Sequence, residues 1–175
     1  MNLYFRWFWM IARLWLRPGS VSLTEPFRRP FRVLPSDCDL NFHLTNSRYF
    51  ALIDLARIEQ LARLKLLRPL IARRWQPVLS ATEITFIRPL PPLRRFELVT
   101  RILTWDDKYF YFEQRFETPG KVYAVSLGRA AFVCRGERVP PARVAALSGY
   151  LEAPADPVLL ETWRQLLKQK KDYFS

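Results

Sequence analysis

The chain has 175 residues and a mass of 20.8 kDa; 50% of the residues are apolar and 25% are charged, which predicts one domain with a hydrophobic core and excludes a disordered chain. Its 28 basic and 16 acidic residues give a net charge of +12, which favours a partner with negative charge, such as nucleic acid, anionic lipid or a phosphate-bearing small molecule. Two cysteines and a single histidine argue against a disulfide framework, a zinc site and two-histidine catalysis, so we expect neither a metal nor a cofactor.

The first 17 residues, MNLYFRWFWMIARLWLR, predict an amphipathic helix. On a helical wheel their polar residues fall within a stripe of about 60° and the rest is apolar and rich in Trp and Phe. The arginines make this run too short and too charged to span a bilayer, and its order of charges differs from that of a signal peptide. The pattern is typical of a helix at a membrane surface, and packing on the body or across a dimer is the alternative. The polar stripe consists of Asn2, Arg6, Arg13 and Arg17.

The remaining chain predicts a short strand, one long helix and four consecutive strands. The helix, Ser47–Leu67, can be capped by Asn46 or Ser47, and its apolar residues cover most of its circumference, which indicates a buried helix. Turn signals at residues 106–107 and 119–120 separate the later strands. One antiparallel sheet wrapped around one long buried helix is an α+β arrangement. The predicted strands are Phe31–Leu34, Val78–Arg88, Phe96–Trp105, Lys108–Thr118 and Val122–Cys134.

Two further segments follow the last predicted strand. Residues 138–148 are rich in Pro and Ala and predict a linker or a short helix. Residues 157–171 predict a polar terminal helix whose apolar contacts are Trp163, Leu166 and Leu167. We therefore divide the chain into an amphipathic segment (1–20), a main domain (21–150) and a C-terminal helix (151–175).

One dense polar cluster lies directly before the long helix. The unpaired N–H groups of a helix start can stabilise negative charge that develops on a carbonyl oxygen. A carboxylate drawn into an apolar setting can act as a base near neutral pH. The cluster therefore predicts a reaction site, and it consists of Asp37, Asp39, Asn41, His43, Asn46 and Tyr49.

The spacing of this cluster, D-x-D-x-N-x-H-x-x-N-x-x-Y, resembles the signature of hotdog-fold acyl thioesterases of the 4-hydroxybenzoyl-CoA thioesterase-like group. By element order the resemblance extends over roughly residues 30–135. It implies a hotdog fold, hydrolysis of acyl-CoA or acyl-carrier-protein thioesters, and a homodimer with its sites at the interface. The chain departs from the family pattern at Thr45, where an asparagine is usual, and at Phe42, where a glycine is frequent.

The resemblance also implies roles for single residues. Asp39 corresponds to the family's general base or nucleophile, and Asn41 and His43 to the residues that position and polarise the reactants. The helix start at Asn46 and Ser47, with Tyr49 one turn further, corresponds to the oxyanion and substrate-binding region. The position of Tyr49 on the first helical turn favours core packing.

Other residues near the cluster favour structural roles. Asp37 favours capping or a salt bridge. Between two carboxylates, Cys38 would have a raised thiol pKa and be a poor nucleophile. We expect Cys134 to be buried among apolar residues.

Two other classes of function compete with the enzyme. A hotdog protein can bind an acyl ligand without turnover. The positive charge is compatible with nucleic-acid binding. No helix-turn-helix, zinc-finger or RNP pattern is present, so we expect no nucleic-acid partner. We expect a reducing compartment, the cytoplasm, with contact to the inner membrane face through residues 1–17. Candidates for contact with CoA phosphates are Arg73, Arg74, Arg88, Arg94 and Arg95.

Overall fold

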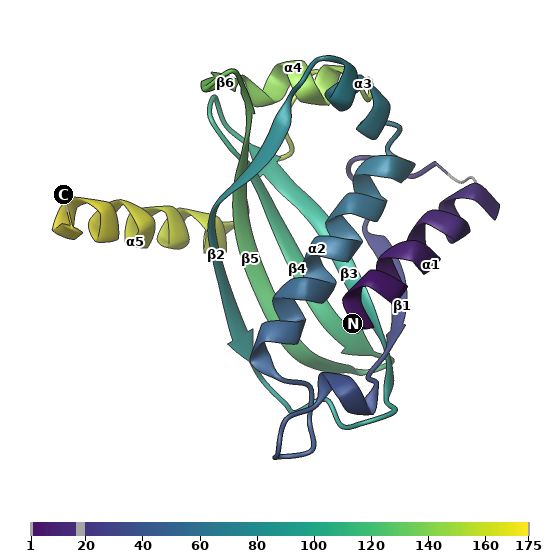
Figure 1. Cartoon of the computed structure of the whole chain (residues 1–175). Coiled ribbons are helices and arrows are strands. Elements are labelled where there is room, and N and C mark those ends of the chain that lie inside the picture. Colours follow the sequence, from purple (N-terminus) through teal and green to yellow (C-terminus); the bar gives the residue numbers. More distant parts are fainter. Residues whose placement is uncertain (1, 17–19, 175) are drawn as a thin grey trace.

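A computed structural model describes residues 2–16 and 20–174 (Figure 1). Among these residues six strands form one antiparallel sheet that curls around a long helix (Figure 1). The helices are α1 (Asn2–Leu16), α2 (Asn46–Arg63), α3 (Leu67–Ala72), α4 (Pro141–Ala146) and α5 (Val158–Phe174), with a 3₁₀ turn, η1 (Pro35–Asp37). The strands are β1 (Phe27–Arg32), β2 (Gln76–Phe86), β3 (Arg95–Trp105), β4 (Phe110–Thr118), β5 (Lys121–Cys134) and β6 (Glu137–Val139).

The strands lie in the order β1-β3-β4-β5-β2, and β6 pairs with the end of β5. The hairpin predicted at residues 106–107 joins β3 to β4, and the Asp106 carboxylate accepts the backbone N–H groups of Lys108 and Tyr109 at 2.7 and 2.8 Å. Residues 138–148 contain the end of β6 and the short helix α4. The predicted α+β arrangement, an antiparallel sheet around one long helix, is confirmed.

The first strand differs from its prediction. It runs over Phe27–Arg32 rather than Phe31–Leu34, and it contains Pro30. β1 stands at one edge of the sheet and pairs with β3 alone, and an edge position tolerates a proline that lacks a backbone N–H.

The long helix begins one residue earlier and ends four residues earlier than predicted. Its N-cap is Thr45, not Asn46 or Ser47, and the Thr45 side chain makes no capping hydrogen bond. At the other end Lys65 has a φ of +57°, and the N–H of Leu66 donates to the carbonyl of Leu61 at 3.0 Å. A positive φ just after a helix is most often adopted by glycine. Because a lysine occupies this position, the sequence gives no signal that the helix ends here.

The α2 helix is buried along one side only. Leu52, Ile53 and Ala56 pack in the main core, whereas Asp54 is exposed. The prediction of burial around most of the circumference was therefore wrong for part of the helix. The sheet covers one side of α2. Apolar residues on the two edges of that side line clefts.

A buried ion network ties α2 to the edge strand. Glu59 of α2 is 2% exposed, and its carboxylate lies 2.5 Å from Nη1 of Arg29 on β1 and 3.1 Å from Nη2 of Arg63. Arg29 also donates to the backbone carbonyl of Leu55 at 3.3 Å. Burial lowers the pKa of Arg29, and the charge of Glu59 opposes that shift.

The N-terminal helix packs on the body through its arginine stripe. Arg6 donates to Oδ2 of Asp37 at 2.5 Å and to the carbonyl of Arg32 at 3.1 Å, and Met10 is buried in the main core. The opposite side of α1 is exposed and aromatic. Packing on the body, the alternative drawn from the sequence, is therefore confirmed for Arg6, while Arg17 and the side chain of Asn2 lie outside the described residues. The exposed aromatic residues are Tyr4, Phe5, Trp7, Phe8 and Trp9.

No helix in the described part of the chain is both long and apolar enough to cross a bilayer.

The C-terminal helix packs on the outer face of the sheet with its first turns only. Leu160 and Trp163 join a cluster with Leu127, and Leu167 packs against that cluster. The indole Nε1 of Trp163 donates to Glu83 of β2 at 2.6 Å. The rest of α5 projects away from the body past β2 (Figure 1), so Leu166, which the sequence predicted as a contact, is exposed.

Glu59→Gln should lower the free energy of unfolding by about 3 kcal/mol, because it leaves the buried Arg29 guanidinium without a compensating charge. Urea titration followed by circular dichroism measures the change. The matched control, Glu97→Gln, breaks an exposed pair with Arg28 and should cost less than about 1 kcal/mol. Equal losses in the two variants would contradict a structural role for the buried network.

Candidate active site

A tight loop carries the predicted catalytic residues. It follows η1, closes through a β-bridge between Cys38 and Leu44, and leads into α2. The backbone N–H of Asp39 donates to the carbonyl of His43 at 3.1 Å, and that of Phe42 donates to the carbonyl of Asp39 at 3.1 Å. These bonds place residues 39 and 43 next to each other.

Phe42 occupies the position where the family often has glycine. Its φ is +53°, in the left-handed region that costs a side-chain-bearing residue about 1–2 kcal/mol. The loop geometry therefore explains the usual glycine. The phenyl ring is largely exposed, so packing within the chain does not offset this cost.

The loop brings Asp39, Asn41 and His43 together. Oδ1 of Asp39 accepts the backbone N–H of Asn41 at 2.9 Å and lies 3.4 Å from Nδ1 of His43. Asn41 thus contributes its backbone to this contact, whereas the sequence suggested its side chain. The Asp39 side chain is 35% exposed, so within one chain it lacks the apolar surroundings that the sequence predicted.

Asp37 has the structural role that the sequence favoured. Its buried carboxylate accepts the backbone N–H of Leu34 at 2.9 Å and the guanidinium of Arg6, and Nε of Arg48 lies 3.8 Å away. Its carbonyl accepts the N–H of Thr45, the N-cap of α2, at 3.0 Å. Asp37 therefore joins α1, the loop and α2.

A cleft of about 340 Å³ opens beside the loop. His43, Asn46 and Tyr49 line one side, while Ser47, which the sequence also proposed, is exposed on the first helical turn and is not among the lining residues. The other wall is the end of β2 and the residues after it. Sequence reasoning missed this wall because nothing local links it to a loop some forty positions earlier. It consists of Phe86, Ile87, Arg88 and Pro89.

Tyr49 is a core residue that also reaches the cleft. Its ring packs against Phe86 and Phe116 with centroid distances of 5.0 and 4.7 Å. Burial raises the pKa of Tyr49 to about 12, so its hydroxyl keeps its proton at neutral pH. The packing role favoured by the sequence is confirmed.

The cysteines behave largely as expected. Burial, followed by the charges of Asp37 and Asp39, raises the pKa of the Cys38 thiol, which makes it a weak nucleophile near neutral pH. Cys134 is partly buried against an apolar cluster. Within the described residues no group of three His, Cys, Asp or Glu is arranged to hold a metal ion.

The five candidate arginines lie in different places. Arg88 lines the cleft and donates to the carbonyl of Val122 at 2.8 Å. Arg73 and Arg74 follow α3, beyond the far end of α2, and an 18-residue helix is about 27 Å long. Arg94 and Arg95 lie at the start of β3. Within one chain Arg88 is therefore better placed than Arg73 or Arg74 to meet a ligand at His43.

Comparison with known proteins identifies the family. A model of the thioesterase-like superfamily matches residues 33–162, so the chain belongs to this superfamily. Protein THEM6 of Xenopus laevis is 42% identical over 84 residues, 48% of this chain and 41% of that protein. The probable thioesterase YBR096W of Saccharomyces cerevisiae is 28% identical over 105 residues, 59% of this chain and 46% of that protein. The chain spans less than half the length of these two relatives.

Solved structures confirm the hotdog fold. The 1,4-dihydroxy-2-naphthoyl-CoA thioesterase of Synechocystis matches with a TM-score of 0.62 at 14% identity, over 71% of this chain and 95% of that chain. At this identity the similarity establishes the fold alone. The reaction of this chain has to be inferred from its own residues.

Proposed function

We propose that this chain is an acyl thioesterase that hydrolyses acyl-CoA or acyl-carrier-protein thioesters, with Asp39 as the general base. The observation that carries the proposal is the contact of the Asp39 carboxylate with His43 and the Asn41 N–H, directly before the start of α2. Membership of the thioesterase-like superfamily supports the same reaction.

In the proposed reaction Asp39 takes a proton from a water molecule, and the water oxygen bonds to the thioester carbon. The contacts of Asn41 and His43 fall on Oδ1, and we assign Oδ2 to the water. The backbone N–H groups of Asn46 and Ser47, which the Thr45 side chain does not cap, would stabilise the oxyanion. The C–S bond then breaks, and the thiolate takes the proton from Asp39.

Two features support a CoA thioester among the candidate substrates. Arg88 lies in the cleft with His43, and a guanidinium suits contact with phosphate. The matched Synechocystis enzyme acts on a CoA thioester according to its name. A carrier-protein thioester, whose phosphopantetheine arm also carries a phosphate, is the alternative substrate.

Asp39→Asn should lower kcat/KM for acyl-CoA hydrolysis by about 100-fold or more, because an amide cannot take a proton from water. Release of free CoA thiol, measured across short, medium, long and aromatic acyl-CoAs, reports the rate. Asp107→Asn is the matched control, since Asp107 is an exposed residue of the β3–β4 turn and should leave the rate unchanged. Full activity in Asp39→Asn would refute the assignment, and acyl-CoA binding without turnover in the wild type would indicate a binder instead of an enzyme.

We further propose a homodimer that forms through β2. This strand has eleven residues, stands at an edge of the sheet and is mostly exposed, and long unpaired edges readily pair with another chain. Helix α5 projects past the same edge (Figure 1). Leu40 and Phe42 beside Asp39 are exposed apolar side chains that a second copy could cover, which would supply the apolar surroundings that Asp39 lacks in one chain.

Val78→Lys should convert a dimer into a monomer of 20.8 kDa, because a lysine on an edge strand opposes pairing with a second edge. Light scattering after size exclusion measures the mass. Ala142→Lys on α4 adds the same charge at an exposed position away from the edge and should leave the mass of the assembly unchanged. A wild-type monomer at micromolar concentration, or a Val78→Lys dimer, would rule out this interface.

The exposed side of α1 supports a contact with a membrane surface. It carries Trp and Tyr together with Phe, the residues that prefer the bilayer interface, and the protein is strongly basic. We propose that this side rests on an anionic membrane on its cytoplasmic face. The free thiols of Cys38 and Cys134 are compatible with the cytoplasm.

The triple substitution Phe5→Ser, Phe8→Ser and Trp9→Ser should weaken binding to vesicles of phosphatidylglycerol and phosphatidylcholine at least tenfold, because it removes the side chains that would enter the interface. Cosedimentation of the full chain measures binding. The three residues are exposed, so the fold and the hydrolysis rate should persist. Equal binding of the variant and the wild type would show that charge alone accounts for the association.

A further inference from the structure

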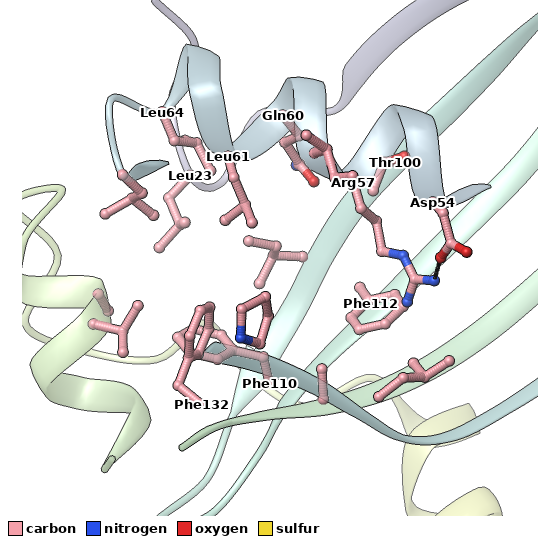
Figure 2. Close-up of a pocket in the computed structure, with 18 residues that line it drawn as sticks. Leu23, Asp54, Arg57, Gln60, Leu61, Leu64, Thr100, Phe110, Phe112 and Phe132 are labelled. Carbon is pink, nitrogen blue, oxygen red and sulfur yellow. Dashed lines mark hydrogen bonds and ion pairs between the residues drawn. The ribbon is translucent and has the colours of Figure 1, made fainter. Parts of the chain in front are cut away.

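A second cavity, of about 350 Å³, lies between the second half of α2 and the sheet (Figure 2). It shares no lining residue with the cleft at His43. Its size is at the lower end of the range for small-molecule sites. Most of its wall is apolar, including Leu61, Leu64, Phe110, Phe112, Phe132 and Val144.

Polar residues gather at one end of this cavity. In Figure 2 Arg57 and Asp54 form an ion pair there, and the Arg57 guanidinium lies 5.3 Å from the ring centroid of Phe112. The Asp54 side chain is 64% exposed, so the cavity opens to solvent at this end, and the exposed lining residues Pro77 and Leu79 of β2 mark a second open part. Gln60 of α2 and Thr100 of β3 also line the cavity.

Gln60 and Thr100 are buried polar side chains with unused hydrogen-bonding atoms. Gln60 is 5% exposed and Thr100 is 1% exposed. Within the part of the chain that the structure describes, Nε2 of Gln60 and Oγ1 of Thr100 have no hydrogen-bond partner. A buried polar atom without a partner costs about 1–3 kcal/mol.

A third such residue lies next to them. Gln114 of β4 is fully buried and pairs with Thr100 across the two strands. Neither polar atom of its side-chain amide has a partner among the described residues. Gln114 is not among the residues that line the cavity, so two of these three buried polar side chains, Gln60 of α2 and Thr100 of β3, line it.

We propose that this cavity binds a medium-length free fatty acid, separate from the thioester at Asp39, that carries a hydroxyl or keto oxygen close to its carboxyl head. The amide N–H of Gln60 and the hydroxyl of Thr100 can both donate to that oxygen, and the apolar wall takes the remaining carbons. At about 30 Å³ for each water-sized group, the cavity holds roughly a dozen such groups, which suits a chain of about ten carbons.

The position of the oxygen follows from the geometry of the cavity. A chain that enters at Arg57 and Asp54 leaves its head near that open end, and Gln60 lies one helical turn beyond Arg57. The oxygen that meets Gln60 and Thr100 is therefore within the first few carbons. With its head at Arg57, eleven residues or about 16 Å along α2 from Asn46, such a molecule cannot have a thioester carbon at Asp39 of the same chain, so the ligand is a free acid and its binding does not rest on the proposed function.

The test measures binding of three ten-carbon acids to the full chain by calorimetry: decanoic acid, 3-hydroxydecanoic acid and 10-hydroxydecanoic acid. We expect the 3-hydroxy acid to bind at least tenfold more tightly than either of the others. Thr100→Val and Gln60→Leu should each remove most of this preference. Thr100→Val should also keep or raise the urea midpoint, because it deletes a hydroxyl without a hydrogen-bond partner. If the hydroxyl had a structural role, the same substitution would lower the midpoint.

Thr104→Val is the matched control. Thr104 lies on the same strand and is equally buried, but its Oγ1 donates to the carbonyl of Pro154 at 2.8 Å, so this variant should lose stability and keep the preference. Equal affinity for the three acids, or a preference that survives in both Thr100→Val and Gln60→Leu, would overturn the proposal and leave a cavity that holds water only. Because the three probes are free acids that cannot be hydrolysed, this titration stands apart from the thioesterase assignment, and Asp39→Asn should keep the preference for the 3-hydroxy acid.

Discussion

The carboxylate of Asp37 holds the proposed active site in place. This carboxylate is buried and accepts hydrogen bonds from the N–H of Leu34 and the guanidinium of Arg6. The backbone carbonyl of Asp37 accepts the N–H of Thr45, the N-cap of α2. These bonds fix both ends of the loop that carries Asp39 and His43. A partly exposed loop would otherwise sample many conformations, and ordering each residue costs about 1–2 kcal/mol. The Asp39 carboxylate, the proposed base, can therefore remain accessible because its neighbour Asp37 is buried.

The same contact explains why α1 lies as it does. A guanidinium is satisfied more fully by a buried carboxylate and a carbonyl than by an exposed position on a helix, so Arg6 faces the body. The aromatic residues are then left on the outside. Their exposure is thus a consequence of the interaction that orders the loop of Asp39 and His43, and it links the position of that loop to the surface that we propose for membrane contact.

Helix α2 separates two environments of opposite character. Its first turn borders the polar loop and the cleft at His43, and its second half covers an apolar cavity with buried polar atoms. The sheet bends around one side of the helix, so the flanks remain available for ligands. Pairing of two chains through β2 would place a second α2 near the first, so that each cleft could draw on residues from both copies.

The sequence by itself determined the order of elements, the α+β class and the cluster Asp39–His43, because these depend on local periodicity and on a motif within a few residues. It also indicated the structural role of Asp37. It missed Pro30 in a strand and the helix end at Lys65, where tertiary position overrides local preference. Only the tertiary structure decided which side of α1 faces inward, that the end of β2 forms a wall of the cleft, and that Gln60 and Thr100 meet at one cavity. These features join residues up to about forty positions apart, and such contacts are set by how the sheet curls around α2 and leave no mark in any local pattern.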